Sequence, residues 1–198
     1  MLNSTPNGTV GLATMTLVAA AVALAASGCN SGSPTEPQRA TPTPTEVSGT
    51  ITFASAGPDR APISAHSEAG FVVQFTAGTW ETWTGYGNPA PFPVFFAPAA
   101  GNATGEIRIT ASGGVFSFRS VDLYSSLTPI PYVIVGTRSA TKEVDFGGTL
   151  PGVVGNTFGD FRTVPNPSAG RLVDTLTITL TNPLGGNPMG LDNIVLTR

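Results

Sequence analysis

The strongest constraint on the fold is a two-residue alternation of apolar and polar side chains near the end of the chain, in residues 172–181. Successive side chains of an extended strand point to opposite faces, whereas helical side chains repeat every 3.6 residues. The pattern therefore predicts a long strand that is buried on one face only. Its apolar positions are Leu172, Leu176, Ile178 and Leu180, and the threonines opposite them are Thr175, Thr177, Thr179 and Thr181.

Shorter apolar or alternating segments recur along the chain from Val47 onward, and no segment shows a sustained helical period. Glycine, proline and asparagine separate them, and the chain contains 24 glycines and 18 prolines, as turn-rich β proteins do. We therefore expect an all-β fold of about ten short strands, an antiparallel sandwich or barrel, over residues 47–198. The expected strands are 47–53, 71–75, 79–84, 94–97, 105–111, 115–123, 132–135, 143–146, 158–164, 172–181 and 191–196.

One of these segments changes phase along its length. In residues 115–123, the apolar positions shift from Phe116 and Phe118 to Val121 and Leu123. A change of one residue in the alternation moves side chains to the other face of a sheet. The segment therefore predicts a β-bulge or a strand that changes sheets.

The beginning of the chain carries a different signal. Residues 10–29 are apolar and uncharged, and they end in Cys29, the only cysteine. An apolar stretch followed by the small residues Ala26, Ser27 and Gly28 is typical of a secretory signal peptide. The stretch resembles the lipobox of bacterial lipoproteins, which implies a signal peptide over residues 1–28 and a diacylglyceryl, palmitate-type anchor on Cys29. An uncleaved membrane helix and a signal peptide with an incidental cysteine are the alternatives.

Residues 29–46 follow the lipobox-like stretch and are rich in proline, threonine and serine, with no aliphatic side chain longer than alanine. Such a segment buries too little apolar area to offset its ordering entropy, so we expect a disordered linker. The anchor and linker together predict an extracytoplasmic protein held on the cell membrane by lipid. Asn30 stands where many inner-membrane lipoproteins have Asp, which favours the outer membrane if the cell is Gram-negative.

The C-terminal half carries a second resemblance. The runs GGVFSFRSVDLYSS, LVDTLTITLTN and GLDNIVL resemble secreted bacterial jelly-roll modules of the carbohydrate-binding kind, over about residues 105–198. The resemblance implies a jelly-roll-like β-sandwich that binds glycans without catalysis. It also implies a structural calcium ion on Asp192, in the last strand. The alternative is that Asp192 or Asn193 bonds to a neighbouring loop backbone, and we expect no other cofactor.

Sugar binding requires exposed aromatic faces with a few polar groups beside them. Trp80, Trp83, Tyr86 and Asn88 lie within nine residues, and they are the candidate ligand-binding set. In a regular strand Trp80 and Trp83 point to opposite faces, so at least one of them is expected in the core. Tyr124 is a second candidate for an exposed ring.

Composition argues against two classes of function. The net charge is -3 and 11% of residues are charged, so no basic surface is available for nucleic acid. His66, the only histidine, lies in a loop-like SAHS context and is expected at the surface, away from any nucleophile. We therefore predict a non-enzyme whose partner is a polysaccharide or an envelope protein. A structural or protein-interaction module is the alternative, and a glycoside hydrolase that uses two of the carboxylates Glu81, Glu106, Asp122 and Asp160 is a third.

Intact mass spectrometry tests the predicted anchor. Protein purified from native membranes is expected to start at Cys29 and to carry the added mass of a diacylglyceryl and an N-acyl group, because two or more acyl chains are needed for stable anchoring. The Cys29→Ser variant should lose that mass and leave the membrane fraction. A chain that retains Met1, or a free thiol at position 29, would contradict the prediction.

Overall fold

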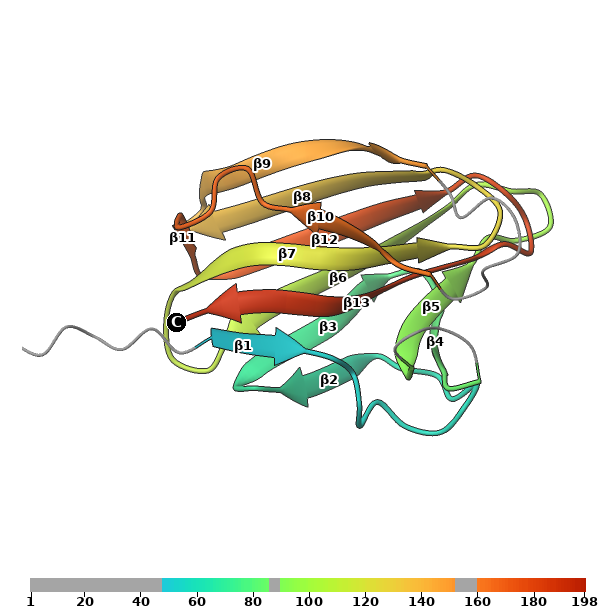
Figure 1. Cartoon of the computed structure of the whole chain (residues 1–198), viewed down its shortest axis with the longest axis horizontal. Helices are drawn as coiled ribbons and strands as arrows, with labels where there is room; N and C mark the ends of the chain where they lie inside the picture. The colour runs from blue at the N-terminus through green and yellow to red at the C-terminus, as the bar shows by residue number, and fades with distance from the viewer. Residues whose placement is uncertain (1–47, 86–89, 152–159) are drawn as a thin grey trace, which may run out of the picture. The chain divides into compact units, whose positions relative to one another are not determined.

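The computed structural model of the chain describes residues 48–85, 90–151 and 160–198. These residues form thirteen strands in two antiparallel sheets that pack face to face (Figure 1). The predicted all-β fold is confirmed. Of the two expected architectures, the structure is the sandwich and not the barrel, because its strands form two open sheets. Within the described ranges, no helix is long and apolar enough to cross a bilayer.

The first sheet, sheet A, is built around β13, the last strand of the chain. β7 pairs with one edge of β13, and β5 and β1 pair in succession with the other edge, through residues 188–190 and 194–197 of β13. Among the described residues, this second edge has no ladder partner at positions 191–193. The strands are β1 (Ser48–Ile51), β4 (Trp80–Trp83), β5 (Phe92–Phe96), β7 (Phe116–Ser125), β10 (Arg162–Pro165), β11 (Leu172–Val173) and β13 (Pro188–Thr197).

The second sheet, sheet B, has six strands in the order β2-β3-β6-β12-β8-β9. β12 lies near its middle, and Leu176, Ile178 and Leu180 are completely buried, as the alternation predicts. The strands are β2 (Ala65–Glu68), β3 (Phe71–Ala77), β6 (Ala103–Ala111), β8 (Ile130–Arg138), β9 (Thr141–Leu150) and β12 (Thr175–Asn182).

Leu172 does not belong to this long strand, and the prediction for its position was wrong. It lies in β11, which pairs with β7 of sheet A, and 41% of it is exposed. The chain passes from one sheet to the other at Asp174, whose backbone N–H donates to the Thr137 carbonyl of sheet B. The apolar alternation therefore runs through a change of sheet that the spacing alone does not reveal.

β2 is a strand that the sequence did not predict. Its residues, AHSE, show no apolar alternation, but they pair in register with β3 from Ala65 opposite Gln74 to Glu68 opposite Phe71. His66 is consequently 8% exposed, and its ring lies 5.1 Å from the Phe53 ring. The expectation of a surface histidine in a loop was wrong because backbone pairing, which does not depend on side-chain type, recruits this segment.

The bulge predicted in residues 115–123 is confirmed. Val195 lies opposite Ser120 but Leu196 lies opposite Phe118, so β7 carries an extra residue, Arg119. β13 carries its own extra residue just after Asp192, where Asn193 has a φ of 45°. The two insertions are on opposite strands and offset each other, so the ladder returns to its original register beyond them.

The core lies between the two sheets, and one close approach sets their separation. Phe95 of β5 points from sheet A toward Gly105 of β6 in sheet B, and a Cβ on Gly105 would overlap the Phe95 ring. Both residues are completely buried or nearly so. Glycine is required at 105 because the aromatic ring occupies the space that any side chain would need.

We expect Gly105→Ala to destabilise the domain by about 1–3 kcal/mol, because overpacking forces the ring and the backbone apart. The double variant Gly105→Ala with Phe95→Leu should recover part of that loss, since the smaller side chain vacates the space. Chemical denaturation of the single and double variants measures this coupling. Equal losses from Gly105→Ala with and without the Phe95 ring would contradict it.

Candidate functional site

The outer face of sheet B carries two rows of side chains that cross the strands. In the first row, Gln74, Arg108, Thr177, Val135 and Asp145 lie opposite one another on five adjacent strands. Such cross-strand partners are separated by the strand spacing of about 4.8 Å. The row therefore places side chains of five strands in one line on the solvent side.

The second row lies beside the first, two residues along each strand. It contains Glu106, Thr179, Val133 and Gly147 in register, and Thr76 joins it at a register shift in β3. The two rows together are called the sheet B platform. Alternate residues of the same strands, such as Ile107 and Ile178, are buried in the core, which fixes the platform side chains outward.

Glu106 is the most constrained polar group of the platform. Its Oε1 accepts a hydrogen bond of 2.7 Å from the Thr76 hydroxyl, and its Oε2 accepts one of 3.3 Å from the Thr179 hydroxyl. Two neighbouring strands therefore hold the carboxylate in place. Lone pairs on both oxygens remain available to donors from a ligand.

Arg108 stands two residues from Glu106 on the same strand and the same face. It is exposed, and no other described residue bonds to its guanidinium group. A carboxylate acceptor and a five-donor guanidinium thus lie side by side at the centre of the platform. Val133, which is 48% exposed, adds an apolar contact beside Gly147.

The tryptophans of the predicted ligand-binding set do not present a stacking face, and this corrects the sequence prediction. Trp80 is 2% exposed and points between the sheets, where its ring lies 4.7 Å from that of Phe95. Trp83 points the other way, as the parity argument requires, but it is also only 6% exposed. The Arg60 guanidinium lies 4.5 Å from the Trp83 ring centroid and covers it.

Trp83 is buried because the outer face of sheet A has a small aromatic cluster of its own. Its members are Trp83, Phe92, Val94 and Tyr124, with Phe96 and Phe161 packed against them. Tyr124, the second expected exposed ring, is completely buried, so that expectation was also wrong. Tyr86, Asn88 and Cys29 lie outside the described residues, and their assignments stay predictions.

Asp192, the predicted calcium ligand, has an unusual environment. It lies at the stretch of β13 where pairing passes from β5 to β1, and it is completely buried. Neither of its carboxylate oxygens has a hydrogen-bond partner among the described residues. A buried carboxylate without a partner is costly, so a proton or a cation is needed to compensate it.

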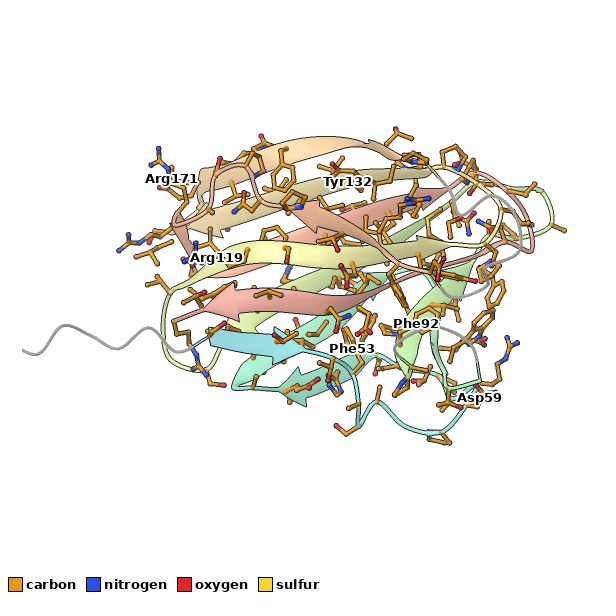
Figure 2. The ribbon with its side chains drawn as sticks, viewed as in Figure 1. Phe53, Asp59, Phe92, Arg119, Tyr132 and Arg171 are labelled. Carbon is orange, nitrogen blue, oxygen red and sulfur yellow. The ribbon has the colours of Figure 1, made fainter. Side chains whose placement is uncertain are left out.

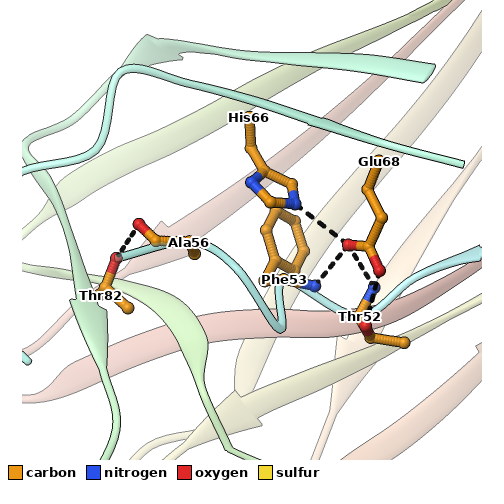
Figure 3. A network of polar contacts seen from close by, with 6 residues as sticks. All are labelled: Thr52, Phe53, Ala56, His66, Glu68 and Thr82. Atoms are coloured by element: carbon orange, nitrogen blue, oxygen red, sulfur yellow. Dashed lines mark hydrogen bonds and ion pairs between the residues drawn. The ribbon is translucent and has the colours of Figure 1, made fainter. Parts of the chain in front are cut away.

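The two acidic neighbours of Asp192 are already satisfied within the protein. Glu68 accepts hydrogen bonds from the Thr52 and Phe53 backbone N–H groups and from Nε2 of His66 (Figure 3). Asp122 accepts from the Thr163 hydroxyl and from Nδ2 of Asn193. Asn193 thus bonds the Asp122 side chain of β7 and Asp192 bonds no described group, so the expected alternative, a bond from either side chain to a neighbouring loop backbone, is not what the structure shows.

Burial above all, together with the nearby negative charges of Asp122 and Glu68, raises the pKa of Asp192 to about 7. The Asn193 backbone N–H opposes this rise without reaching hydrogen-bonding geometry. Although partial burial opposes it, the hydrogen bonds from Thr52, His66 and Phe53 lower the pKa of Glu68. The site thus combines an ionised Glu68 with an Asp192 that holds its proton over a wide pH range.

The two free oxygens of Asp192 suit one ligand position of a hard cation, which binds six to eight oxygens in the case of calcium. In the described ranges no group of three or more His, Cys, Asp or Glu side chains is arranged to hold a metal. The other ligands of a cation there would have to be backbone carbonyls or water. Calcium binding at Asp192 stays a prediction.

Two of the carboxylates considered for hydrolysis, Glu106 and Asp122, lie on different sheets. Glu106 lies on the outer face of sheet B, whereas Asp122 lies on the outer face of sheet A, with the core between them. Asp122 is directly opposite Asp192 in the β7–β13 ladder, but the burial of Asp192 keeps substrate from it. Glu81 forms an ion pair of 2.7 Å with Arg60.

No family model matches the sequence, and no curated protein matches it. Solved structures do show likeness. A family 29 carbohydrate-binding module from Piromyces equi is 12% identical, with a TM-score of 0.45 over 77% of this chain and 91% of the module.

Two further structures are similar to parts of the chain. TmCBM61, solved in complex with β-1,4-galactotriose, is 12% identical, with a TM-score of 0.38 over 66% of this chain and 89% of that one. An arabinose-bound α-L-arabinofuranosidase is 10% identical, with a TM-score of 0.40 over 75% of this chain and 26% of that one. At such low identities and TM-scores, these likenesses assign no function to the chain.

The protonation of Asp192 can be tested by measuring how the free energy of unfolding depends on pH, with a chelator present to remove calcium. The pKa of Asp192 rises on folding from 3.8 to about 7. Its contribution to the stability of the folded state is therefore fully present below pH 3.8, the pKa of the unfolded state, and is lost as the pH rises through about 7. The rise in pKa corresponds to a change of roughly 4 kcal/mol at most in the free energy of unfolding. Asp192→Asn should therefore gain stability relative to wild type between pH 4 and pH 8, as followed by denaturant unfolding.

Calcium provides the second arm of the same experiment. Millimolar calcium at pH 8 should raise the melting temperature of wild type but not that of Asp192→Asn, because only the wild type offers the carboxylate. Asp160→Asn, which removes an exposed carboxylate, is the matched control and should behave as wild type. An equal calcium response in wild type and Asp192→Asn would remove Asp192 from any cation site.

Proposed function

We propose that this domain is a non-catalytic glycan-binding module and that the sheet B platform is its binding surface. The observation that carries the proposal is the pair of Glu106 and Arg108 at the centre of the two cross-strand rows, with Glu106 held by Thr76 and Thr179. Vicinal sugar hydroxyls both donate and accept hydrogen bonds, so a fixed acceptor beside a fork of donors matches them.

The platform has the features that an extended sugar chain requires. It is open along five strands, and its threonine hydroxyls add further donors and acceptors around the central pair. The exposed side chain of Val133 beside Gly147 offers an apolar contact for the C–H face of a sugar ring. Because cross-strand neighbours are about 4.8 Å apart, a chain that lies across the strands meets a new side chain at almost every sugar.

We further propose that the module acts outside the cytoplasm, held on the membrane by lipid on Cys29. The lipobox-like run that ends at Cys29 supports this proposal. The alternative is a structural or protein-interaction module of the cell envelope, which would use the same polar surface for a protein partner.

Binding to a panel of soluble polysaccharides tests the proposal. Arg108→Ala and Glu106→Gln should each weaken binding by roughly tenfold or more, because hydrogen bonds to charged groups contribute about 1.5–3 kcal/mol. Both side chains point away from the core, so the melting temperature should change little. Isothermal titration calorimetry or affinity electrophoresis measures the effect.

Arg162→Ala is the matched control, since Arg162 is an exposed arginine of β10 in sheet A, whereas the platform lies on sheet B; Figure 2 shows the side chains on the ribbon. It should bind as wild type. Unchanged binding in both platform variants would move the site elsewhere. A captured envelope protein that is released by Arg108→Ala, with no glycan bound across the panel, would favour the protein-interaction alternative.

A further inference from the structure

Three loops meet at the end of the sandwich opposite β1 and the C-terminus (Figure 1). They are residues 97–102 between β5 and β6, residues 126–129 between β7 and β8, and residues 183–187 between β12 and β13. Ala97 forms a backbone bridge with Gly185, and the Ser126 N–H donates to the Pro188 carbonyl. The three loops are therefore one continuous surface, called here the apolar end.

The apolar end contains no charged residue. Leu127 is 62% exposed and Leu184 is 44% exposed, and they are two of the four large apolar side chains that stand out most from the described surface. Pro98, Ala99, Ala100, Pro129 and Pro183 are exposed around them. Arg171 lies at the opposite end of the domain (Figure 2), with the β8–β9 turn and the β11–β12 connection, whose charged residues are Arg138, Lys142, Glu143 and Asp174.

Two buried asparagines hold the exposed leucines in place. Asn187 and Asn182 bond to each other, through Nδ2 of Asn187 to Oδ1 of Asn182 at 3.1 Å and through Nδ2 of Asn182 to the Asn187 carbonyl at 2.7 Å. Oδ1 of Asn187 accepts the Leu127 N–H, and Oδ1 of Asn182 accepts the Leu184 N–H. Each protruding leucine is thus fixed by one member of a completely buried pair.

Other backbone donors of the apolar end are also satisfied within the protein. Gly101 donates to the Pro98 carbonyl, Gly186 donates to the Ala97 carbonyl, and Thr128 donates to the Ser125 hydroxyl. The three prolines have no N–H to satisfy. This matters because an unsatisfied backbone group costs several kcal/mol in hydrocarbon, whereas in water it costs nothing.

We propose that the apolar end is a membrane-contacting surface, which inserts Leu127 and Leu184 into the interface of a lipid bilayer. A protein partner would ordinarily make about one hydrogen bond per 100–200 Å² of interface and engage a polar rim. This surface instead lacks charges, and the N–H groups of both protruding leucines are bonded within the protein, which favours contact with lipid. The contact is driven by apolar burial, so it needs neither anionic lipid nor low salt.

The experiment uses the full chain with Cys29→Ser in every variant, so that the N-terminal residues are identical throughout. An environment-sensitive fluorophore is placed at Ala99→Cys, in the apolar end, or at Ser168→Cys, an exposed position between β10 and β11 at the other end. On addition of phosphatidylcholine vesicles, the probe at 99 should shift to the blue and be quenched by spin-labelled lipid. The probe at 168 should do neither.

Leu127→Ser with Leu184→Ser should lower the vesicle partitioning reported by the probe at 99 by roughly tenfold or more, because it removes the apolar area that enters the bilayer. Leu172→Ser, which removes an exposed leucine at the other end, is the matched control and should have no effect. Equal responses at 99 and 168, or an unchanged response in the double variant, would overturn the proposal. A concentration-dependent shift without vesicles would overturn it in favour of self-association.

Discussion

The sandwich depends on a single strand, β13, that gathers segments from the whole length of the domain. It pairs with β7 on one edge and with β5 and then β1 on the other, so the first and last strands become neighbours. These pairings are long-range, and they form only after large loops have closed. Sheet B then packs on the inner face of β13 and its neighbours, and the position of every outward side chain follows from that packing.

Asp192 lies where β13 changes its partner from β5 to β1, and the two offsetting bulges lie just beyond it. In the same stretch the buried Asp192 carboxylate has no hydrogen-bond partner among the described residues, and such burial is costly. The nearby Glu68 is fully bonded to the Thr52–Phe53 turn, which ties sheet B to the end of β1. The raised pKa of Asp192 therefore belongs to the point at which β13 changes its partner.

Much of this fold could be predicted from the alternation of side chains, because burial on one face imposes it. The buried face of β12 and the bulge in β7 both follow from the phase of their apolar residues. β2 could not be predicted, since its polar sequence is recruited by backbone pairing. Leu172 was misassigned because the change of sheet at Asp174 keeps the apolar spacing intact.

The candidate site was harder to predict. The outward direction of Glu106 and Arg108 is legible in the alternation of β6, but their neighbours on β3, β12 and β8 depend on a cross-strand register that no local pattern specifies. The ligand-binding prediction for Trp80 and Trp83 was wrong because a large aromatic side chain is found both on binding surfaces and in cores. Their opposite parity was correct, but sheet A proved to have an aromatic cluster on its outer face as well.

The pairing of β1 with β13 also has a mechanical consequence. Ser48 lies opposite Thr197, so the chain enters the domain at the end where β13 finishes, and the loops of the opposite end lie at the start of β13. If the domain is held at that far end and pulled through Ser48, β1 is drawn lengthwise past β13. Such a load strains all the hydrogen bonds of the four-residue ladder together, and resists extension far better than peeling them one at a time.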